Sequence, residues 1–119
     1  MSAKIDPARM EEEWAADQEV LKSLAENGDR AELVRPVDVS FRGSVEALDR
    51  LEDAAEALGF EVVDRETDDD GTLTLFLERE QAADAASIKA LTTTCLEIEA
   101  EYGVEYDGWG CTAETGSTH

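Results

Sequence analysis

Apolar side chains recur every three or four residues near the start of the chain, a spacing typical of a helix with one buried face. The predicted helix begins at an Asp6-Pro7 cap and stops at Asn27-Gly28. Its apolar stripe consists of Met10, Trp14, Leu21 and Leu24. Its polar cover includes Glu11, Glu12, Glu13, Asp17 and Glu19. We therefore predict a first helix with one packed face and one acidic face.

Two further segments show the same helical spacing. One follows Gly43-Ser44 and stops at Gly59, and the other begins near Asp84 and ends at Gly103. The stripe of the earlier segment is Val45, Leu48, Leu51, Ala55 and Leu58. The stripe of the later segment is Ile88, Leu91, Cys95, Ile98 and Tyr102. The chain is thus predicted to hold three helices.

Between the helices the apolar period falls to two, which is typical of strands with one buried face. The first alternation starts at Val37, after a Pro36 that suits an edge or an entry position. Further strands are predicted at residues 60–63, 72–77 and 104–109. Asp-Gly between the second and third strands indicates a hairpin whose loop exceeds two residues.

The element order is a helix followed by βαββαβ. This order predicts an α+β fold, a ferredoxin-like sandwich with an antiparallel four-stranded sheet and an extra N-terminal helix. We predict an acidic helix at residues 1–28, packed on or appended to a domain at 34–111, and a short flexible tail at 112–119.

Charge narrows the range of partners. Thirty Asp and Glu against ten Lys and Arg give a net charge of −20. Affinity for RNA, DNA or an acidic membrane rests on Lys and Arg, so none of these is an expected direct partner. Partners should instead carry positive charge. The chain has neither a long apolar run nor a basic, apolar leader, which makes the cytoplasm the expected location.

Few residues offer catalytic or metal chemistry. Cys95 and Cys111 form no C-x-x-C pair, and His119 is the only histidine. No nucleophile with a base, no dinucleotide fingerprint and no phosphate loop is present. We therefore predict a protein that is not an enzyme, with no cofactor and no metal.

Two segments are candidates for binding. An acidic run contains Asp64, Glu66, Asp68, Asp69 and Asp70. It is interpreted as a solvated turn, with a weak ion site or a contact for a basic partner as alternatives.

The second segment, residues 103–110, concentrates aromatic residues and glycines. Trp109 either wedges into the edge of the core or faces a partner. Tyr106 should pack against the helices, on the side of the strand opposite Glu105 and Asp107.

The second segment also carries a family resemblance. Val104-Glu105-Tyr106-Asp107-Gly108-Trp109-Gly110, together with Leu58-Gly59-Phe60-Glu61-Val62, resembles the RraB family, the regulators of ribonuclease activity B. The resemblance implies a ferredoxin-like domain without catalytic activity that binds the poorly structured scaffold region of ribonuclease E and modulates RNA degradation. The acidic C-terminal tail of that family is not matched by residues 112–119.

The expected partner is ribonuclease E or another protein with an Arg/Lys-rich segment. Its predicted binding residues are Glu105, Tyr106, Asp107, Trp109, Asp68, Asp69 and Asp70. Two alternative functions remain open. One is a small-molecule-sensing ferredoxin-like module, and the other is a general acidic mimic of nucleic acid that binds many basic proteins.

Overall fold

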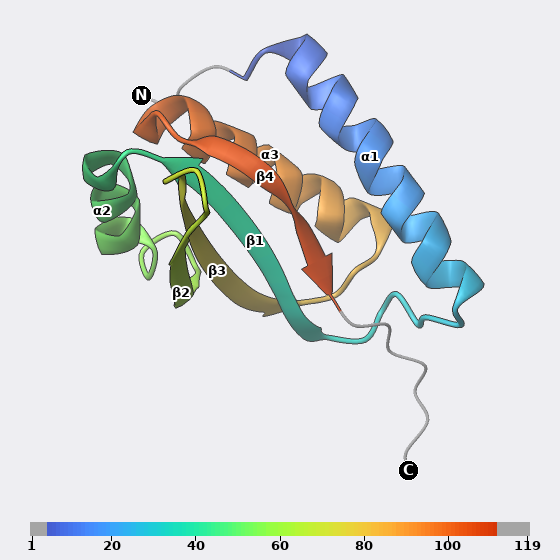
Figure 1. Ribbon diagram of the computed structural model, residues 1–119. Helices are drawn as coiled ribbons and strands as arrows, with labels where there is room; N and C mark the ends of the chain where they lie inside the picture. The colour runs from blue at the N-terminus through green and yellow to red at the C-terminus, as the bar shows by residue number, and fades with distance from the viewer. Residues whose placement is uncertain (1–4, 112–119) are drawn as a thin grey trace.

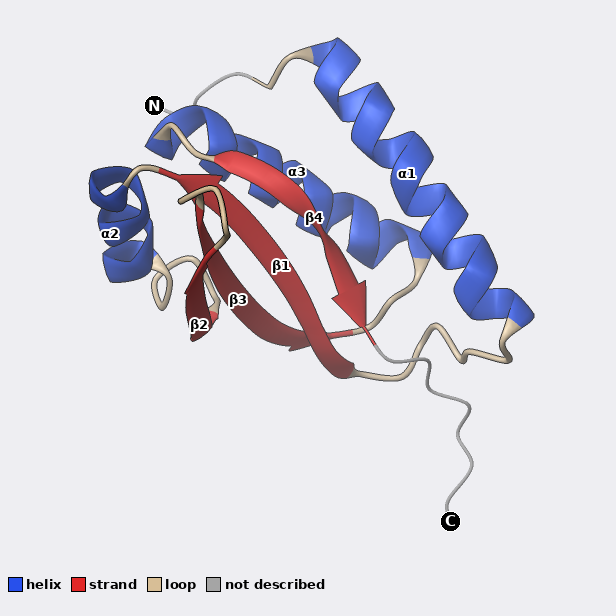
Figure 2. Ribbon diagram, viewed as in Figure 1, coloured by secondary structure: helices blue, strands red, loops and turns tan. Residues whose placement is uncertain are grey.

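A computed structural model describes residues 5–111 of the chain. Within these residues three helices accompany one antiparallel sheet of four strands (Figures 1 and 2). The helices are α1 (Pro7–Glu26), α2 (Val45–Ala54) and α3 (Ala85–Tyr102). The strands are β1 (Arg35–Gly43), β2 (Glu61–Thr67), β3 (Leu73–Gln81) and β4 (Glu105–Cys111). The predicted tail at 112–119 lies outside the described residues.

The strand order is β2-β3-β1-β4, and all neighbouring strands are antiparallel. With α2 and α3 on one face, this is the ferredoxin-like βαββαβ sandwich, so the predicted fold class is confirmed. The added helix α1 lies alongside α3, on the side of the sheet where β4 forms the edge (Figure 1). No helix of the described residues lies on the opposite face of the sheet.

Local sequence signals set the helix ends as predicted. Asp6, Ser44 and Asp84 each accept a hydrogen bond from a backbone N–H in the first turn of the following helix. These bonds satisfy donors that have no partner within the helix. Gly103 ends α3 with a φ of 70°, a left-handed conformation that glycine adopts without a steric penalty.

The core lies between the sheet and the two helices that cover it. Alternate residues of β1 and β3 supply the sheet side, as the period-two pattern predicts. The stripes of α2 and α3 supply the other side. The largest apolar side chains that are fully buried are Phe41, Leu48, Leu51, Leu75, Leu77, Ile88, Leu91, Leu96, Val37 and Val39.

Some details of the predicted elements are wrong. Val45 is 50% exposed, and Ala47 takes the inward place in α2, which ends at Ala54, several residues before Gly59. β2 extends to Thr67 and β3 to Gln81, beyond the predicted ends. Pro36 enters a central strand, where it is tolerated because β4 pairs with β1 only from Val37 onward.

The placement of Asp17 corrects the prediction that it belongs to the exposed acidic side of α1. Asp17 is 3% exposed. Its carboxylate accepts hydrogen bonds from Thr92 Oγ1 on α3 at 2.5 Å and from Trp109 Nε1 on β4 at 2.8 Å. Burial raises the pKa of this carboxyl above its ordinary value. Asp17 therefore joins α1 to both neighbouring elements.

A second polar cluster fixes the first half of α1. Arg9 donates to Glu99 on α3 at 2.9 Å, to Glu13 at 2.6 Å and to the carbonyl oxygen of Tyr106 at 3.0 Å. Glu99 also accepts from the backbone N–H of Tyr106 at 2.8 Å. Arg9 and Glu99 therefore hold α1, α3 and the start of β4 together.

Among residues 5–111, no helix is both long and apolar enough to span a membrane.

Candidate functional site

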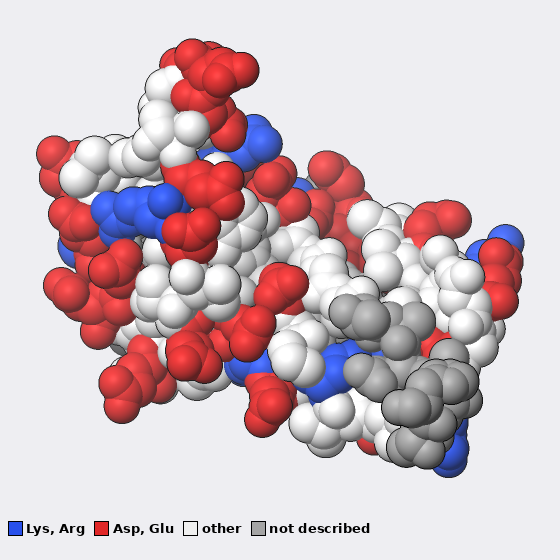
Figure 3. Space-filling model, turned by 60° about the horizontal axis from the view of Figure 1, so that its bottom comes forward, with Lys and Arg blue, Asp and Glu red and all other residues white. Residues whose placement is uncertain are grey.

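The face of the sheet that carries no helix is strongly acidic. We call it the outer sheet face. Its members are Asp38, Ser40, Arg42, Glu61, Val63, Asp64, Glu66, Thr74, Phe76, Glu78, Glu80, Glu105 and Asp107. Viewed with the bottom of the molecule turned forward, red acidic side chains are spread over the surface with white side chains between them (Figure 3).

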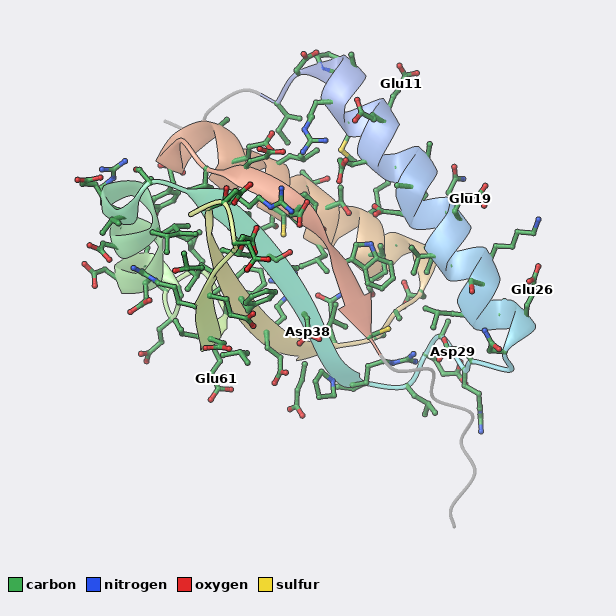
Figure 4. All side chains as sticks on the ribbon, in the orientation of Figure 1. Glu11, Glu19, Glu26, Asp29, Asp38 and Glu61 are labelled. Atoms are coloured by element: carbon green, nitrogen blue, oxygen red, sulfur yellow. The ribbon has the colours of Figure 1, made fainter. Side chains whose placement is uncertain are left out.

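Three carboxylates of this face lie directly opposite one another across three strands. Asp38 on β1 is paired with Glu78 on β3, which in turn is paired with Glu61 on β2. Asp38 and Glu61 mark the two sides of this row in Figure 4. The pKa of Glu78 is raised, first by its partial removal from water and then by Asp38 and Glu61. Because like charges placed opposite each other destabilise a sheet, the row is not explained by stability.

Beside the row lies a shallow groove of about 370 Å³. Phe76 and Val63 line it, and Val63 is 53% exposed where the register between β2 and β3 shifts. Carboxylates from three strands also line the groove: Asp38, Asp64, Glu66 and Asp107. An apolar floor with a rim of negative charge is therefore open to solvent.

Positive charge is scarce on this face. Within the four strands as described, Arg42 is the one basic residue at an outward position, and it pairs with Asp107 at 3.4 Å. Arg65 turns to the other side of the sheet and binds Asp49 and Glu52 of α2. Most carboxylates of the outer sheet face therefore lack a basic neighbour from these strands.

The predicted acidic residues fall on or beside this face. Glu105 and Asp107 occupy exposed outward positions of β4. Asp68, Asp69 and Asp70 are exposed in the turn between β2 and β3. The pKa of Asp70 is lowered, mainly by the backbone N–H of Thr72 and to a smaller extent by the charge of Arg42. Arg42 thus lies between the two predicted acidic segments.

The two predicted aromatic residues lie on the opposite side of the sheet. The register between β1 and β4 shifts, so that three residue steps from Tyr106 to Trp109 face two steps from Phe41 to Val39. Gly108, with a φ of 104°, occupies this bulge. Both rings therefore point toward the helices, where Tyr106 is 2% exposed and Trp109 bonds to α1 at the edge of the core. Their contact with a partner stays a prediction.

The two cysteines are poor nucleophiles. Cys95 is fully buried, and burial raises its pKa. Burial is also the main cause of the raised pKa of Cys111. Both groups are therefore neutral thiols near neutral pH, whereas nucleophilic chemistry needs the thiolate. Among the described residues 5–111, no group of three or more His, Cys, Asp and Glu side chains is arranged to hold a metal ion.

Sequence reasoning missed the centre of the outer sheet face. Asp38, Phe76 and Glu78 were not among the predicted binding residues. Their signal was the alternation itself, because each lies between residues whose side chains are buried or turned toward the helices. Only the strand order shows that these three outward positions are neighbours.

Comparison with known proteins defines the relationship. Residues 14–111 match the family model described as Regulator of ribonuclease activity B. The chain belongs to this family. Proteins of that name in three organisms are similar to it. The one from Aeromonas salmonicida is 34% identical, over 83% of this chain and 91% of its own. Those from Pseudoalteromonas atlantica and Colwellia psychrerythraea are 34% and 30% identical, over 82% and 83% of this chain and 89% and 90% of their own.

The match to the RraB family includes most of the structure described here. It begins within α1 at Trp14 and ends with β4 at Cys111. The outer sheet face and the bonds from Asp17 to α3 and β4 therefore lie inside the matched range.

Proposed function

We propose that this protein inhibits a ribonuclease by binding an Arg/Lys-rich segment of the enzyme, without catalysis of its own. Its membership of the RraB family supports a regulatory role in RNA degradation. The enzyme we propose is ribonuclease E, and the segment is the poorly structured scaffold region of that enzyme.

The observation that carries this proposal is the outer sheet face. Its carboxylates lie on adjacent strands, and Arg42 is the one outward basic residue of the described strands. Such a surface repels phosphate groups and attracts cationic segments. A guanidinium group can bind a carboxylate through two parallel hydrogen bonds, which adds orientation to the charge attraction.

Inhibition then follows from competition. A basic segment that holds RNA does so through the same Lys and Arg side chains that would bind the carboxylates here. RNA and this protein would therefore exclude each other from the segment. Much of the attraction is screened beyond about 8–10 Å at physiological salt, so binding should weaken as salt is added.

The absence of catalysis is also part of the proposal. The thiols of Cys95 and Cys111 are held neutral by burial. The groove lies on the outer sheet face, and four carboxylates line it together with Phe76, Trp109, Ser40, Val39, Val63 and two glycines. This lining suits recognition of a cationic side chain more than the activation of a nucleophile.

Affinity purification from the native cell, with and without added RNase, tests the partner. The protein should retain a ribonuclease with a basic segment in both samples, because the contact is between proteins. Retention that disappears after RNase treatment would show that RNA bridges the two and would contradict the proposal. Capture of many unrelated basic proteins at similar levels would indicate a general mimic of nucleic acid.

A further inference from the structure

We infer that the groove on the outer sheet face is the docking site for arginine side chains of an extended cationic segment. This inference rests on the proposed function and assigns it a place on the molecule. The three helices lie away from this face, so the groove is open in the described structure (Figure 1).

The groove combines the two features that recognise a guanidinium group. The ring of Phe76 lies between Ser40 on β1 and Asp64 on β2, near the middle of the sheet. A flat guanidinium stacks on an aromatic ring through its face and donates hydrogen bonds from its edge. Carboxylates on both sides of the ring, Asp64 and Asp38 among them, would accept those bonds.

These features favour arginine over lysine. An ammonium group is strongly hydrated and compact, so it gains less from a ring and cannot bridge two acceptors in one plane. The aliphatic stem of arginine would lie on Val63, whose side chain is otherwise half in water. A segment with several arginines should therefore bind more tightly than the same segment with lysines.

The outer side of α1 provides an internal comparison. Glu11, Glu19 and Glu26 are exposed there and point away from the domain (Figure 4). They add to the same net charge, but none of them lines the groove. If general attraction were sufficient, both surfaces would contribute equally to binding. The inference predicts that the groove contributes much more.

Two double variants with equal changes in charge test this difference. Asp64→Asn with Glu66→Gln removes two carboxylates from the groove, and Glu11→Gln with Glu19→Gln removes two from α1. The probe is a fluorescein-labelled peptide of alternating Arg and Gly, titrated by fluorescence anisotropy. We expect the groove variant to weaken binding about tenfold and the α1 variant less than about twofold. Equal weakening in both would overturn the inference.

A third variant separates the ring from the charges. Phe76→Ala should reduce the preference for the Arg peptide over a Lys peptide of the same length, because the stacking surface is lost. An unchanged preference in a folded variant would overturn the role of the ring. Glu78→Gln is a variant that should stay folded, because removing one of three neighbouring like charges should raise the melting temperature. The same change should weaken binding of the peptide. Binding that stays unchanged in this stabilised variant would count against the row as part of the site.

Parallel titrations with the basic segment of ribonuclease E distinguish this inference from the proposed function. Loss of binding in the α1 variant, with the groove variant intact, would overturn the groove and leave the proposed function standing. No binding of the segment by the unaltered protein would overturn the proposed function itself.

Discussion

Removing the carboxylate of Asp17 should loosen α1 from the domain. In Asp17→Ala, the Thr92 hydroxyl and the Trp109 indole N–H both lose their acceptor. A buried donor left without a partner costs about 1–3 kcal/mol. Thr92 is fully buried, but Trp109 is partly exposed and can regain water, and removal of a buried charge offsets part of the loss.

We therefore expect Asp17→Ala to lower the free energy of unfolding by about 2 kcal/mol. For a domain of this size that corresponds to a fall in melting temperature of roughly 6–12 °C. Urea unfolding followed by far-UV circular dichroism measures the change. Tryptophan fluorescence reports the loosening directly, since Trp14 lies on α1 and Trp109 bonds to it, and its emission should shift to longer wavelength.

Asp17→Asn is the matched control. Its amide oxygen can accept from Trp109, and its NH₂ can donate to the Thr92 hydroxyl, so its stability at pH 7 should stay within about 1 kcal/mol of the unaltered protein. An alanine variant as stable as the asparagine variant would refute the role of Asp17 as a buried acceptor.

The unaltered protein and Asp17→Asn should also differ in how their stability depends on pH. Because the pKa of Asp17 is raised in the folded state, the stability gained by protonating it is fully present below its unfolded pKa of about 3.9. That stability is lost as pH rises through the folded pKa. Asparagine does not titrate. The stability of Asp17→Asn relative to the unaltered protein should therefore rise as pH increases from the unfolded pKa of Asp17 to its folded pKa, and then level off. A constant difference would mean that burial leaves the pKa of Asp17 unchanged.

Three further predictions concern other features of the fold. Gly108→Ala should lower the free energy of unfolding by about 1–2 kcal/mol in urea titrations, because a φ of 104° disfavours a side chain; an unchanged value would argue against the bulge. Arg35→Met should lower the free energy of unfolding by about 3–5 kcal/mol, because the substitution removes the buried ion pair between Arg35 and Asp29. A variant as stable as the unaltered protein would contradict this role of the ion pair. Neutral salt should raise the melting temperature, because it screens the repulsion of a net charge of −20; a flat response in calorimetry would mean that the charges are already well separated or paired.

The fold was largely predictable because local signals and long-range packing agree. The alternation around Val39 and the caps at Ser44 and Asp84 each indicate one local structure. The order of the strands in the sheet is the one inferred by analogy with other ferredoxin-like sandwiches. The end of β2 was less predictable, because Val62, Val63 and Asp64 do not alternate. Pairing with β3 holds this strand in place despite its exposed side chains.

The candidate site was predictable only in part. Glu105 and Asp107 were found because one alternating stretch of sequence contains them both. Asp38 and Glu78 are 40 positions apart in the chain, and only the pairing of β1 with β3 brings them together. Trp109 was ambiguous because the bulge reverses its side of the sheet, and the alternation of the sequence does not show the bulge.

We propose that an acidic face of this protein takes the place of RNA on a basic segment of a ribonuclease. The most direct measurement is the anisotropy of a labelled RNA bound to the basic segment of ribonuclease E while this protein is added. We expect the anisotropy to fall to the value of free RNA, with a midpoint that moves to higher protein concentration as salt increases. Anisotropy that stays high at saturating protein, or that rises when the protein is mixed with RNA alone, would contradict it.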